Sequence, residues 1–238
     1  MTATRKPAKK SAKPARKPTA ARLRKLLATE LGFWAEGLPH VAGVDEVGRG
    51  PLAGPVVAAA VILPEGCWIE GVDDSKKLTH ERRVELYGRI MASCVCYGVG
   101  AASAAVIDRI NIRRATALAM QRAIRRLACP PGHLLVDGLP VPELGLHGQT
   151  AIVDGDAKVH CIAAASILAK VTRDRLMERL ALRHPAYGWE RNKGYGTPEH
   201  LVAMERHGCT RHHRQSFQPV QHTFGDTLRI QALVHDAH

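Results

Sequence analysis

Four acidic residues each lie at or just beyond the end of a segment that the hydrophobic pattern predicts to be a buried strand. They are Asp45, Glu46, Asp137 and Asp156. If those strands are neighbours in one sheet, their ends bring the four carboxylates together. Converging carboxylates repel one another, and bound divalent cations are the usual resolution. Because the set contains only oxygen ligands, it favours Mg²⁺ or Mn²⁺ over zinc.

A glycine-rich turn, Gly48-Arg49-Gly50-Pro51, directly follows the first two acids. Its glycines leave backbone N–H groups uncovered, so a polar ligand such as a phosphate or a sugar can approach closely. One difficulty concerns Asp45 and Glu46, because adjacent residues of a regular strand point to opposite faces. The turn, or a main-chain carbonyl near Glu46, has to resolve this if both residues serve one site.

The same turn formally matches the dinucleotide-binding pattern GxGxxG/A, and acids follow it about 20 residues later at Asp73 and Asp74. That pattern requires a helix that begins at the turn and holds the pyrophosphate. Here Gly54-Pro55 breaks such a helix, and β-branched residues follow. The sequence therefore disfavours a dinucleotide site.

The elements that must position these residues follow from hydrophobic periodicity and from turn residues. Predicted strands cover residues 41–46, 53–63, 94–102, 133–136 and 150–153. Predicted helices cover residues 79–93, 103–110, 111–128, 161–183 and 198–207, with a weak helical stretch at 227–234. A meander of strands followed by alternating strands and helices predicts an α/β fold. We expect a mixed central sheet flanked by helices, with a helical C-terminal part.

Composition separates a basic N-terminal segment from a nearly neutral body. Ten of the 34 Lys and Arg residues lie within residues 1–25, which contain no acid, so 24 basic residues face 22 acidic ones in the remainder. We expect a disordered basic tail at 1–28, one folded domain at 29–226 and a C-terminal tail at 227–238. Such a basic tail attracts nucleic acid without sequence preference, and a transit peptide is the weaker alternative.

The remaining composition points to a cytoplasmic protein. No apolar run approaches the ~20 residues of a membrane-spanning helix. The basic start lacks the apolar core of a secretory signal. The six cysteines include no CxxC pair, so we expect reduced thiols.

Seven motifs, in a fixed order between Val41 and Val220, resemble those of the bacterial ribonuclease HII (type 2 ribonuclease H) family. They are GVDEVGRGPLAGPVV, DSKKL, VDG, GDAKV, AAASILAKVTRD, KGYGT and HHRQSF. The resemblance implies a ribonuclease H-like catalytic domain at 29–226. It also implies a monomeric endonuclease that cuts the RNA strand of RNA–DNA hybrids and cuts 5′ to single ribonucleotides in duplex DNA. Hydrolysis would use two divalent ions, Mn²⁺ or Mg²⁺, and leave 3′-OH and 5′-phosphate ends.

The resemblance also implies roles for particular residues. The four acids match the catalytic, metal-binding carboxylates of the family, with Asp45 the best candidate to bridge both ions. The loop residues Gly48, Arg49 and Gly50 match the loop that reads the ribose 2′-OH, the group that distinguishes RNA from DNA. Tyr195 matches the tyrosine that packs against the sugar beside the ribonucleotide. Backbone phosphates are contacted in relatives at the positions of Ser75, Lys76 and Lys77.

Two features leave the assignment open in detail. Many relatives carry a basic residue where this chain has Asp154, so either Asp154 or Asp156 approaches the metal. His212 and His213 lie in a basic stretch and are expected near substrate phosphates. As a zinc pair they lack a third ligand.

Two other functions are alternatives. A resolvase-like or transposase-like nuclease shares paired acids on a similar fold, and a requirement for a 2′-OH at the cut site separates it from a ribonuclease. A non-catalytic nucleic-acid-binding protein would leave the four acids unexplained, since acids oppose nucleic-acid binding unless metal is present. Dependence of turnover on a divalent ion decides that case.

Overall fold

A mixed β-sheet forms the centre of the computed structural model, which describes residues 20–72, 78–145 and 148–222. Within these residues the sheet has five strands in the order β3-β2-β1-β4-β5. The strands are β1 (Val41–Val47), β2 (Val56–Ile62), β3 (Cys96–Ala102), β4 (His133–Asp137) and β5 (Gln149–Ile152). β1 pairs antiparallel with β2 and β2 with β3, whereas β4 is parallel to β1 and β5 to β4. The predicted α/β fold with a mixed sheet is confirmed, and each predicted strand overlaps an observed one.

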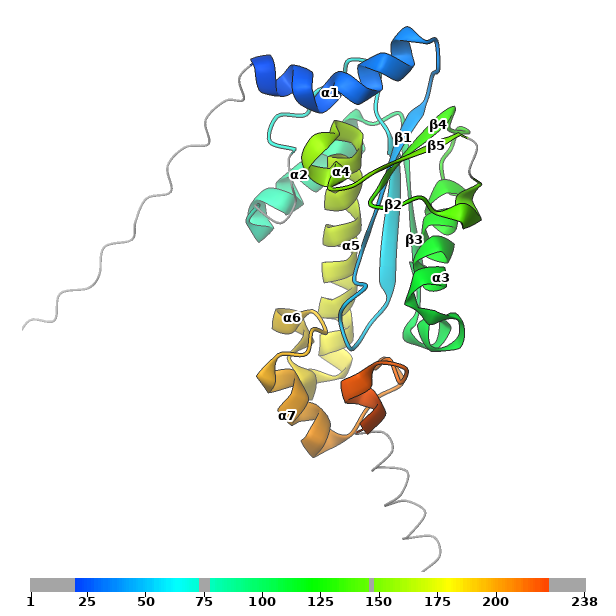
Figure 1. Ribbon diagram of the computed structural model, residues 1–238. Helices are drawn as coiled ribbons and strands as arrows, with labels where there is room; N and C mark the ends of the chain where they lie inside the picture. Colours follow the sequence, from blue (N-terminus) through cyan, green and yellow to red (C-terminus); the bar gives the residue numbers. More distant parts are fainter. Residues whose placement is uncertain (1–19, 73–77, 146–147, 223–238) are drawn as a thin grey trace, which may run out of the picture.

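Helices cover both faces of the sheet and extend beyond one end of it (Figure 1). The helices are α1 (Ala20–Ala35), α2 (His80–Ser93), α3 (Ala104–Ile124), α4 (Gly155–Lys158), α5 (His160–Arg183), α6 (Trp189–Asn192) and α7 (Pro198–His207), with 3₁₀ turns at Pro142–Leu144 and Pro185–Tyr187. α5 and α2 pack on one face, and α3 packs on the other. α6 and α7 form the expected helical C-terminal part. None of the helices in the described part of the chain is long and apolar enough to cross a membrane.

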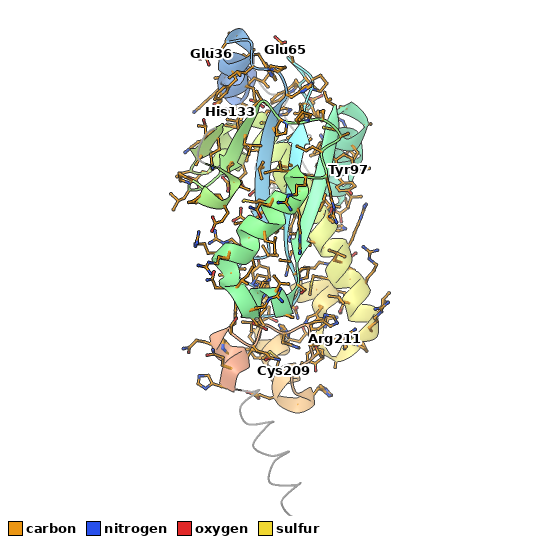
Figure 2. All side chains as sticks on the ribbon, turned by 90° about the vertical axis from the view of Figure 1, so that its right-hand side faces the viewer. Glu36, Glu65, Tyr97, His133, Cys209 and Arg211 are labelled. Atoms are coloured by element: carbon orange, nitrogen blue, oxygen red, sulfur yellow. The ribbon has the colours of Figure 1, made fainter. Side chains whose placement is uncertain are left out.

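The two ends of the molecule are built from different parts of the chain. Figure 2, which views the sheet from the side of α3, shows Glu36 and Glu65 at one end and Cys209 and Arg211 at the other. The first end carries α1, and the second carries the C-terminal helices. The sheet therefore connects an N-terminal helix to a C-terminal helical part that lies far from it.

Small residues let the helices approach the sheet at backbone distance. All seven residues of β2, Val-Val-Ala-Ala-Ala-Val-Ile, are buried, as a strand covered on both faces requires. A Cβ atom added to Gly43 in β1 would lie 2.2 Å from the carbonyl carbon of Cys161 in α5. On the opposite face, a Cβ atom on Gly100 would lie 2.1 Å from the carbonyl oxygen of Ala119 in α3. Glycine is therefore required where each covering helix crosses the sheet.

α3 is interrupted at Asn111, whose backbone adopts φ 64° and ψ 165°. The prediction of two successive helices, 103–110 and 111–128, is confirmed by this break. The side-chain Oδ1 of Asn111 accepts the N–H of Arg114 at 3.1 Å, which caps the second half of the helix.

The basic face of α3 covers the open edge of the sheet. β3 is the outermost strand on this side, and an outermost strand carries backbone groups without a neighbouring strand. Arg122 of α3 donates to the carbonyl of Ala101 at 2.6 Å, and Arg126, two residues beyond the end of the helix, donates to the carbonyl of Val99. Part of the charge of α3 is therefore used within the fold.

The predicted disordered tail at 1–28 is wrong for residues 20–28, because α1 begins at Ala20. The high density of Lys and Arg before residue 25 is typical of a disordered segment. However, Leu26 and Glu30, four residues apart and so on one face of α1, are both buried against the domain. Residues 1–19, the predicted helical stretch at 227–234 and the predicted C-terminal tail lie outside the described residues.

Glu30 attaches α1 to α5. It is 1% exposed, and its Oε1 accepts the N–H of Cys161, 2.8 Å away in the first turn of α5. A carboxylate at this place also meets the positive end of the helix dipole. Burial is nevertheless the larger effect and raises the pKa of Glu30 to about 7. The folded chain therefore keeps this proton to a higher pH than the unfolded chain does.

We expect Glu30 to make the folded state less stable as the pH rises from 4.5 to about 7. In this window the unfolded chain releases the proton and the folded chain keeps it, so stability falls with increasing pH. Glu30→Gln removes this contribution. The free energy of unfolding of Glu30→Gln, relative to that of the wild type, should therefore increase by about 3 kcal/mol as the pH rises through this window. Urea unfolding at a series of pH values measures the difference between the two proteins, and a difference that is constant with pH contradicts the raised pKa.

The same comparison is insensitive to His160, the other buried titratable group near the start of α5. Burial lowers the pKa of His160 to about 4. The folded chain then binds fewer protons than the unfolded chain between this value and the ordinary value of 6.5, so stability rises with pH there. Both proteins contain His160, and its contribution cancels in the difference.

We expect Gly43→Ala to destabilise the fold by about 1–3 kcal/mol, because the added methyl group collides with the backbone of α5. Gly88→Ala is the matched control, since nothing lies within 4 Å of the Cβ position of Gly88 in α2. That control should stabilise the protein by up to about 1 kcal/mol, because alanine is the better helix former. Thermal unfolding of both variants gives the comparison. Wild-type stability of Gly43→Ala would contradict the close packing of β1 against α5.

Candidate active site

The four acids that the sequence singled out line one cavity of about 430 Å³. Asp45 and Glu46 end β1, Asp137 ends β4, and Asp156 lies in α4. β1 and β4 are parallel neighbours, so their carboxyl ends lie at the same edge of the sheet. The other residues around the cavity are Val47, Arg83, Ser166, Lys170 and Tyr195. The expected convergence of distant acids is therefore what the structure has.

Asp45 and Glu46 do point to opposite sides of β1, and both still reach this cavity. Asp45 is 4% exposed and is hydrogen-bonded by Ser166 of α5. Glu46 also lines a second cavity of about 340 Å³ on the side of α3. The pairing of β1 with β4 ends at Val44 and Val136. Beyond that pair no backbone hydrogen bonds join β1 to β4, so the two faces of the sheet are open to each other there. Glu46 therefore lines both cavities.

Burial and mutual repulsion govern the charge of these carboxyl groups. Burial, followed by the charges of Glu46 and Asp137, raises the pKa of Asp45 well above its ordinary value. Burial also raises the pKa of Glu46, although its ion pair with Arg49 at 3.2 Å opposes this effect. The N–H of Glu46 donates to Asp45 Oδ1 at 2.6 Å, and the N–H of Gly155 donates to Asp137 Oδ1 at 2.6 Å. A cation in the cavity would relieve the repulsion that remains.

Asp156, and not Asp154, faces the cavity. Asp156 is 3% exposed and is one of the lining residues. Asp154 is exposed, has a left-handed backbone (φ 54°, ψ 40°) and precedes the first residue of α4. A Cβ atom on the intervening Gly155 would lie 2.7 Å from Ile162 Cδ1, so glycine is needed for this turn to approach α5. The geometry thus distinguishes two aspartates that the sequence left as alternatives.

Three polar residues of the cavity had no assigned role in the sequence. Ser166 and Lys170 stand one helical turn apart on α5, and Lys170 forms an ion pair with Asp174 at 2.8 Å. Arg83 reaches the cavity from α2 and donates to the carbonyl of Leu78. Ser166 and Lys170 are separated by four residues in the small, apolar first half of α5, and this spacing is the sequence signal that would have indicated the face.

Two buried arginines hold the glycine-rich loop. Arg214 donates through Nε to the carbonyl of Gly54 (3.1 Å) and through its two Nη atoms to the carbonyls of Arg49 (2.7 Å) and Gly48. Arg173 donates to the carbonyls of Pro55 (3.0 Å), Lys193 (3.0 Å) and Ala53 (3.2 Å). Burial, and then the charge of Arg173, lowers the pKa of Arg214 to about 9. Both arginines lie in motifs that the sequence singled out, but the sequence indicated no role for either in holding the loop, because their partners are backbone oxygens.

These bonds also orient the N–H groups of the loop. A trans peptide places its C=O and the following N–H on opposite sides. The carbonyls of Gly48 and Arg49 point to Arg214, so the N–H groups of Arg49 and Gly50 point away from it, toward the exposed side of the loop. Gly48 itself has φ +89°, and a Cβ atom there would lie 2.1 Å from Arg173 Nε. The loop therefore presents two donors to a ligand, as its glycines suggested.

Tyr195 stands between this loop and the acids. It is 46% exposed, lines the cavity, and has its Cε1 atom 3.8 Å from the Cβ position of Gly50. The structure thus brings Tyr195 together with Gly48, Arg49 and Gly50. The predicted phosphate contacts Ser75, Lys76 and Lys77 lie outside the described residues.

The acids form an oxygen-only set of donors that suits a hard divalent cation such as Mg²⁺ or Mn²⁺. They line one cavity, but their carboxylate groups are not gathered around a single position. In residues 20–72, 78–145 and 148–222, no three His, Cys, Asp or Glu side chains converge as a ready set of ligands. The alternative zinc pair is not supported, because His213 uses Nδ1 to accept the N–H of Thr210 and places Nε2 against His200.

Comparison with known proteins finds relatives that share most of this chain. The family model described as Ribonuclease HII matches residues 42–220. The ribonuclease HII of Bacillus thuringiensis (strain Al Hakam) is 54% identical over 186 residues, which cover 78% of this chain and 72% of the relative. That of Desulfitobacterium hafniense (strain DSM 10664 / DCB-2) is 52% identical over 207 residues, covering 87% and 79%.

Solved structures share the fold. The ribonuclease H2 of Pyrococcus horikoshii OT3 superposes with a TM-score of 0.67 at 28% identity, over 78% of this chain and 97% of that one. A Bst-RNase HIII solved in complex with Mn²⁺ superposes with a TM-score of 0.59, over 92% and 77% of the two chains. At 17% identity, the second likeness concerns the fold alone.

We expect Ser166→Ala to raise the pKa of Asp45 further, because the hydroxyl group donates a hydrogen bond to the ionised carboxylate. Losing a hydrogen bond to a charged group is worth about 1.5–3 kcal/mol, and this loss favours the protonated carboxyl group. Carbonyl ¹³C NMR of the metal-free protein follows this titration. Ser103→Ala is the control, because Ser103 caps α3 without a side-chain hydrogen bond. An unchanged Asp45 titration in Ser166→Ala would contradict the assigned contact.

Proposed function

The chain belongs to the ribonuclease HII family and is a ribonuclease H hydrolase, and on this premise we propose that it also cuts 5′ to single ribonucleotides in duplex DNA. The observation that carries the proposal is the placement of four carboxylates beside a loop with outward N–H groups and beside Tyr195. The acids suit hydrolysis of a phosphodiester, and the loop suits recognition of the hydroxyl group that only a ribonucleotide has.

In the proposed mechanism Asp45, Glu46, Asp137 and Asp156 hold two divalent ions, Mn²⁺ or Mg²⁺. Such ions supply an activated water and stabilise the charge that develops on the leaving 3′-oxygen. Asp45 would be the best candidate to contact both ions, since it is buried and is repelled by both Glu46 and Asp137. The products carry 3′-OH and 5′-phosphate ends, and no side chain forms a covalent intermediate.

The remaining residues around the cavity bind and orient the substrate strand. The N–H groups of Arg49 and Gly50 donate to the 2′-OH, with Gly48 and Gly50 leaving room for the sugar. The ring of Tyr195 packs against the neighbouring sugar at the junction between RNA and DNA. Arg83 and Lys170 offer positive charge to the phosphate that is cut.

The wider proposal includes the rest of the chain. Ser75, Lys76 and Lys77 contact backbone phosphates, and the basic residues within 1–25 add a salt-dependent attraction to the duplex. The enzyme acts as a monomer in the cytoplasm on RNA–DNA hybrids and on duplex DNA that contains ribonucleotides.

We expect Asp45→Asn to reduce cleavage by at least about 10²–10³-fold, the usual loss when one preorganised electrostatic group is removed. Binding of the substrate should be largely kept, because Asp45 repels the phosphate when no metal is present. Asp154→Asn is the matched control, since Asp154 is exposed and lies outside the cavity. The assay uses a labelled duplex with one embedded ribonucleotide. Wild-type cleavage by Asp45→Asn would refute the assignment of the metal site.

The same duplex, an all-DNA control and an RNA–DNA hybrid separate the candidate functions. Each is incubated with Mg²⁺, with Mn²⁺ and with a chelator. We expect metal-dependent cleavage just 5′ to the ribonucleotide and none in the all-DNA control. Cleavage of both DNA duplexes would indicate a general nuclease of related fold. Absence of cleavage in every duplex would favour a nucleic-acid-binding protein.

A further inference from the structure

A chain of buried imidazoles lies directly behind Tyr195. His200 in α7 and His213 in the C-terminal segment are both buried, with their Nε2 atoms 3.2 Å apart. The buried indole of Trp189 donates through Nε1 to His200 Nε2 at 3.0 Å. At the other side of the His200 ring, Nδ1 lies 2.8 Å from the backbone carbonyl oxygen of Tyr195. The chain therefore ends on the main chain of the residue that faces the substrate.

The neighbours determine which nitrogen of each ring carries the proton. The indole N–H of Trp189 can only donate, so His200 Nε2 accepts and His200 Nδ1 carries the proton that it donates to Tyr195. The backbone N–H of Thr210 donates to His213 Nδ1 at 2.9 Å, so the proton of His213 is on Nε2 and points at His200. Both rings are neutral in this arrangement. Burial supports it, since it lowers the pKa of His200 and lowers that of His213 to about 3.

Arg214, the residue after His213, extends toward the glycine-rich loop and not toward Tyr195. Arg214 donates to the carbonyls of Gly48 and Arg49, and its own N–H donates to the carbonyl of Leu52 at 2.8 Å. His213 also forms an isolated β-bridge with Ala53. Two consecutive residues thus connect the two parts of the site that face the sugar. His213 acts on Tyr195 through His200, and Arg214 acts on the loop directly.

We propose that His200, His213 and Arg214 form a positioning element that sets the separation between the N–H groups of the Gly48–Gly50 loop and the ring of Tyr195. This separation determines how strictly the enzyme requires a junction between ribose and deoxyribose. None of the three side chains touches substrate, because all are buried. The inference rests on the proposed function, in which the loop reads the 2′-OH and Tyr195 the adjacent sugar.

The physical reason is the steep dependence of hydrogen-bonded recognition on position. A displacement of about 1 Å at a reacting or reading group costs on the order of 10²-fold in rate. The carbonyl of Tyr195 also accepts the N–H of Thr197 at 2.8 Å, a bond within the same turn. Loss of the imidazole bond leaves this carbonyl with one donor in place of two and removes its link to α7. Tyr195 would then shift relative to a loop that Arg214 still holds.

The test compares two substrates, a duplex with one embedded ribonucleotide and a continuous RNA–DNA hybrid of equal length. The readout is the ratio of kcat/KM on the first to kcat/KM on the second. His200→Leu should lower kcat on the single-ribonucleotide duplex by about 10–100-fold with little change in KM. The hybrid has ribose on both sides of each cut and no junction with deoxyribose. Cleavage of the hybrid should therefore depend little on the position of Tyr195. The ratio should therefore fall.

Conservative variants distinguish positioning from general stability. His200→Asn keeps a donor near the place of Nδ1, and its ratio should stay within about threefold of the wild-type ratio because the bond to Tyr195 is retained. His184→Leu is the matched control, since His184 belongs to the same aromatic cluster, 5.4 Å from Trp189 between ring centroids. Its ratio should be unchanged. If His200→Leu does not fold, His213→Gln and His213→Leu give the same comparison, because glutamine keeps a donor near Nε2.

The outcomes separate this inference from the proposed function. A fall in the ratio for His200→Leu, with recovery in His200→Asn, supports the positioning element. Equal losses on both substrates in His200→Leu or His213→Leu would mean that the imidazoles only maintain the folded fraction, and the inference is wrong. If the wild-type enzyme cuts hybrids but not single ribonucleotides, the proposed function is overturned, and the inference with it.

Discussion

The burial of two guanidinium groups behind the glycine-rich loop is the constraint on which the site depends. Removing a charge from water costs several kcal/mol unless its donors are satisfied. Arg173 and Arg214 meet this cost with six backbone carbonyls. Five of these belong to the segment Gly48–Pro55, and the sixth is that of Lys193. Any other path of the loop would leave buried donors without acceptors. The loop is therefore fixed by the needs of the arginines as much as by its own glycines.

Carbonyl partners have a second effect, because the donors of both arginines are used on backbone oxygens and not on Asp45. Asp45 is repelled by its acidic neighbours and is held by single hydrogen bonds from Ser166 and from the N–H of Glu46. Its charge remains available to a cation. The nearest acid that serves the C-terminal segment is Asp108 of α3, which accepts the N–H groups of Gln215 and Ser216. Structural and chemical carboxylates are thus different residues.

The acids were predictable because strand ends can be recognised from hydrophobic runs, and the parallel pairing of β1 with β4 brings those ends together. Arg173 and Arg214 were not predictable. Their partners are backbone oxygens, which have no sequence signature, and all but the carbonyl of Lys193 lie more than a hundred residues away in the chain. α1 was missed for a different reason, since its basic start resembles a disordered tail. The choice between Asp154 and Asp156 needed a backbone angle that sequence does not provide.

Arg122 of α3 and Arg126, just beyond the end of that helix, donate to the carbonyls of β3, and this has a consequence for how molecules meet in solution. An uncovered outer strand is a template on which another chain can form a ladder, and such pairing leads to aggregation. Arg122 and Arg126 donate to the carbonyls of Ala101 and Val99, so these two acceptors of β3 are already used. The two guanidinium groups also place positive charge where another strand would have to pair. α3 and the turn after it thus cover one face of the sheet and also protect its outer strand. Self-association through the edge of the sheet is therefore disfavoured.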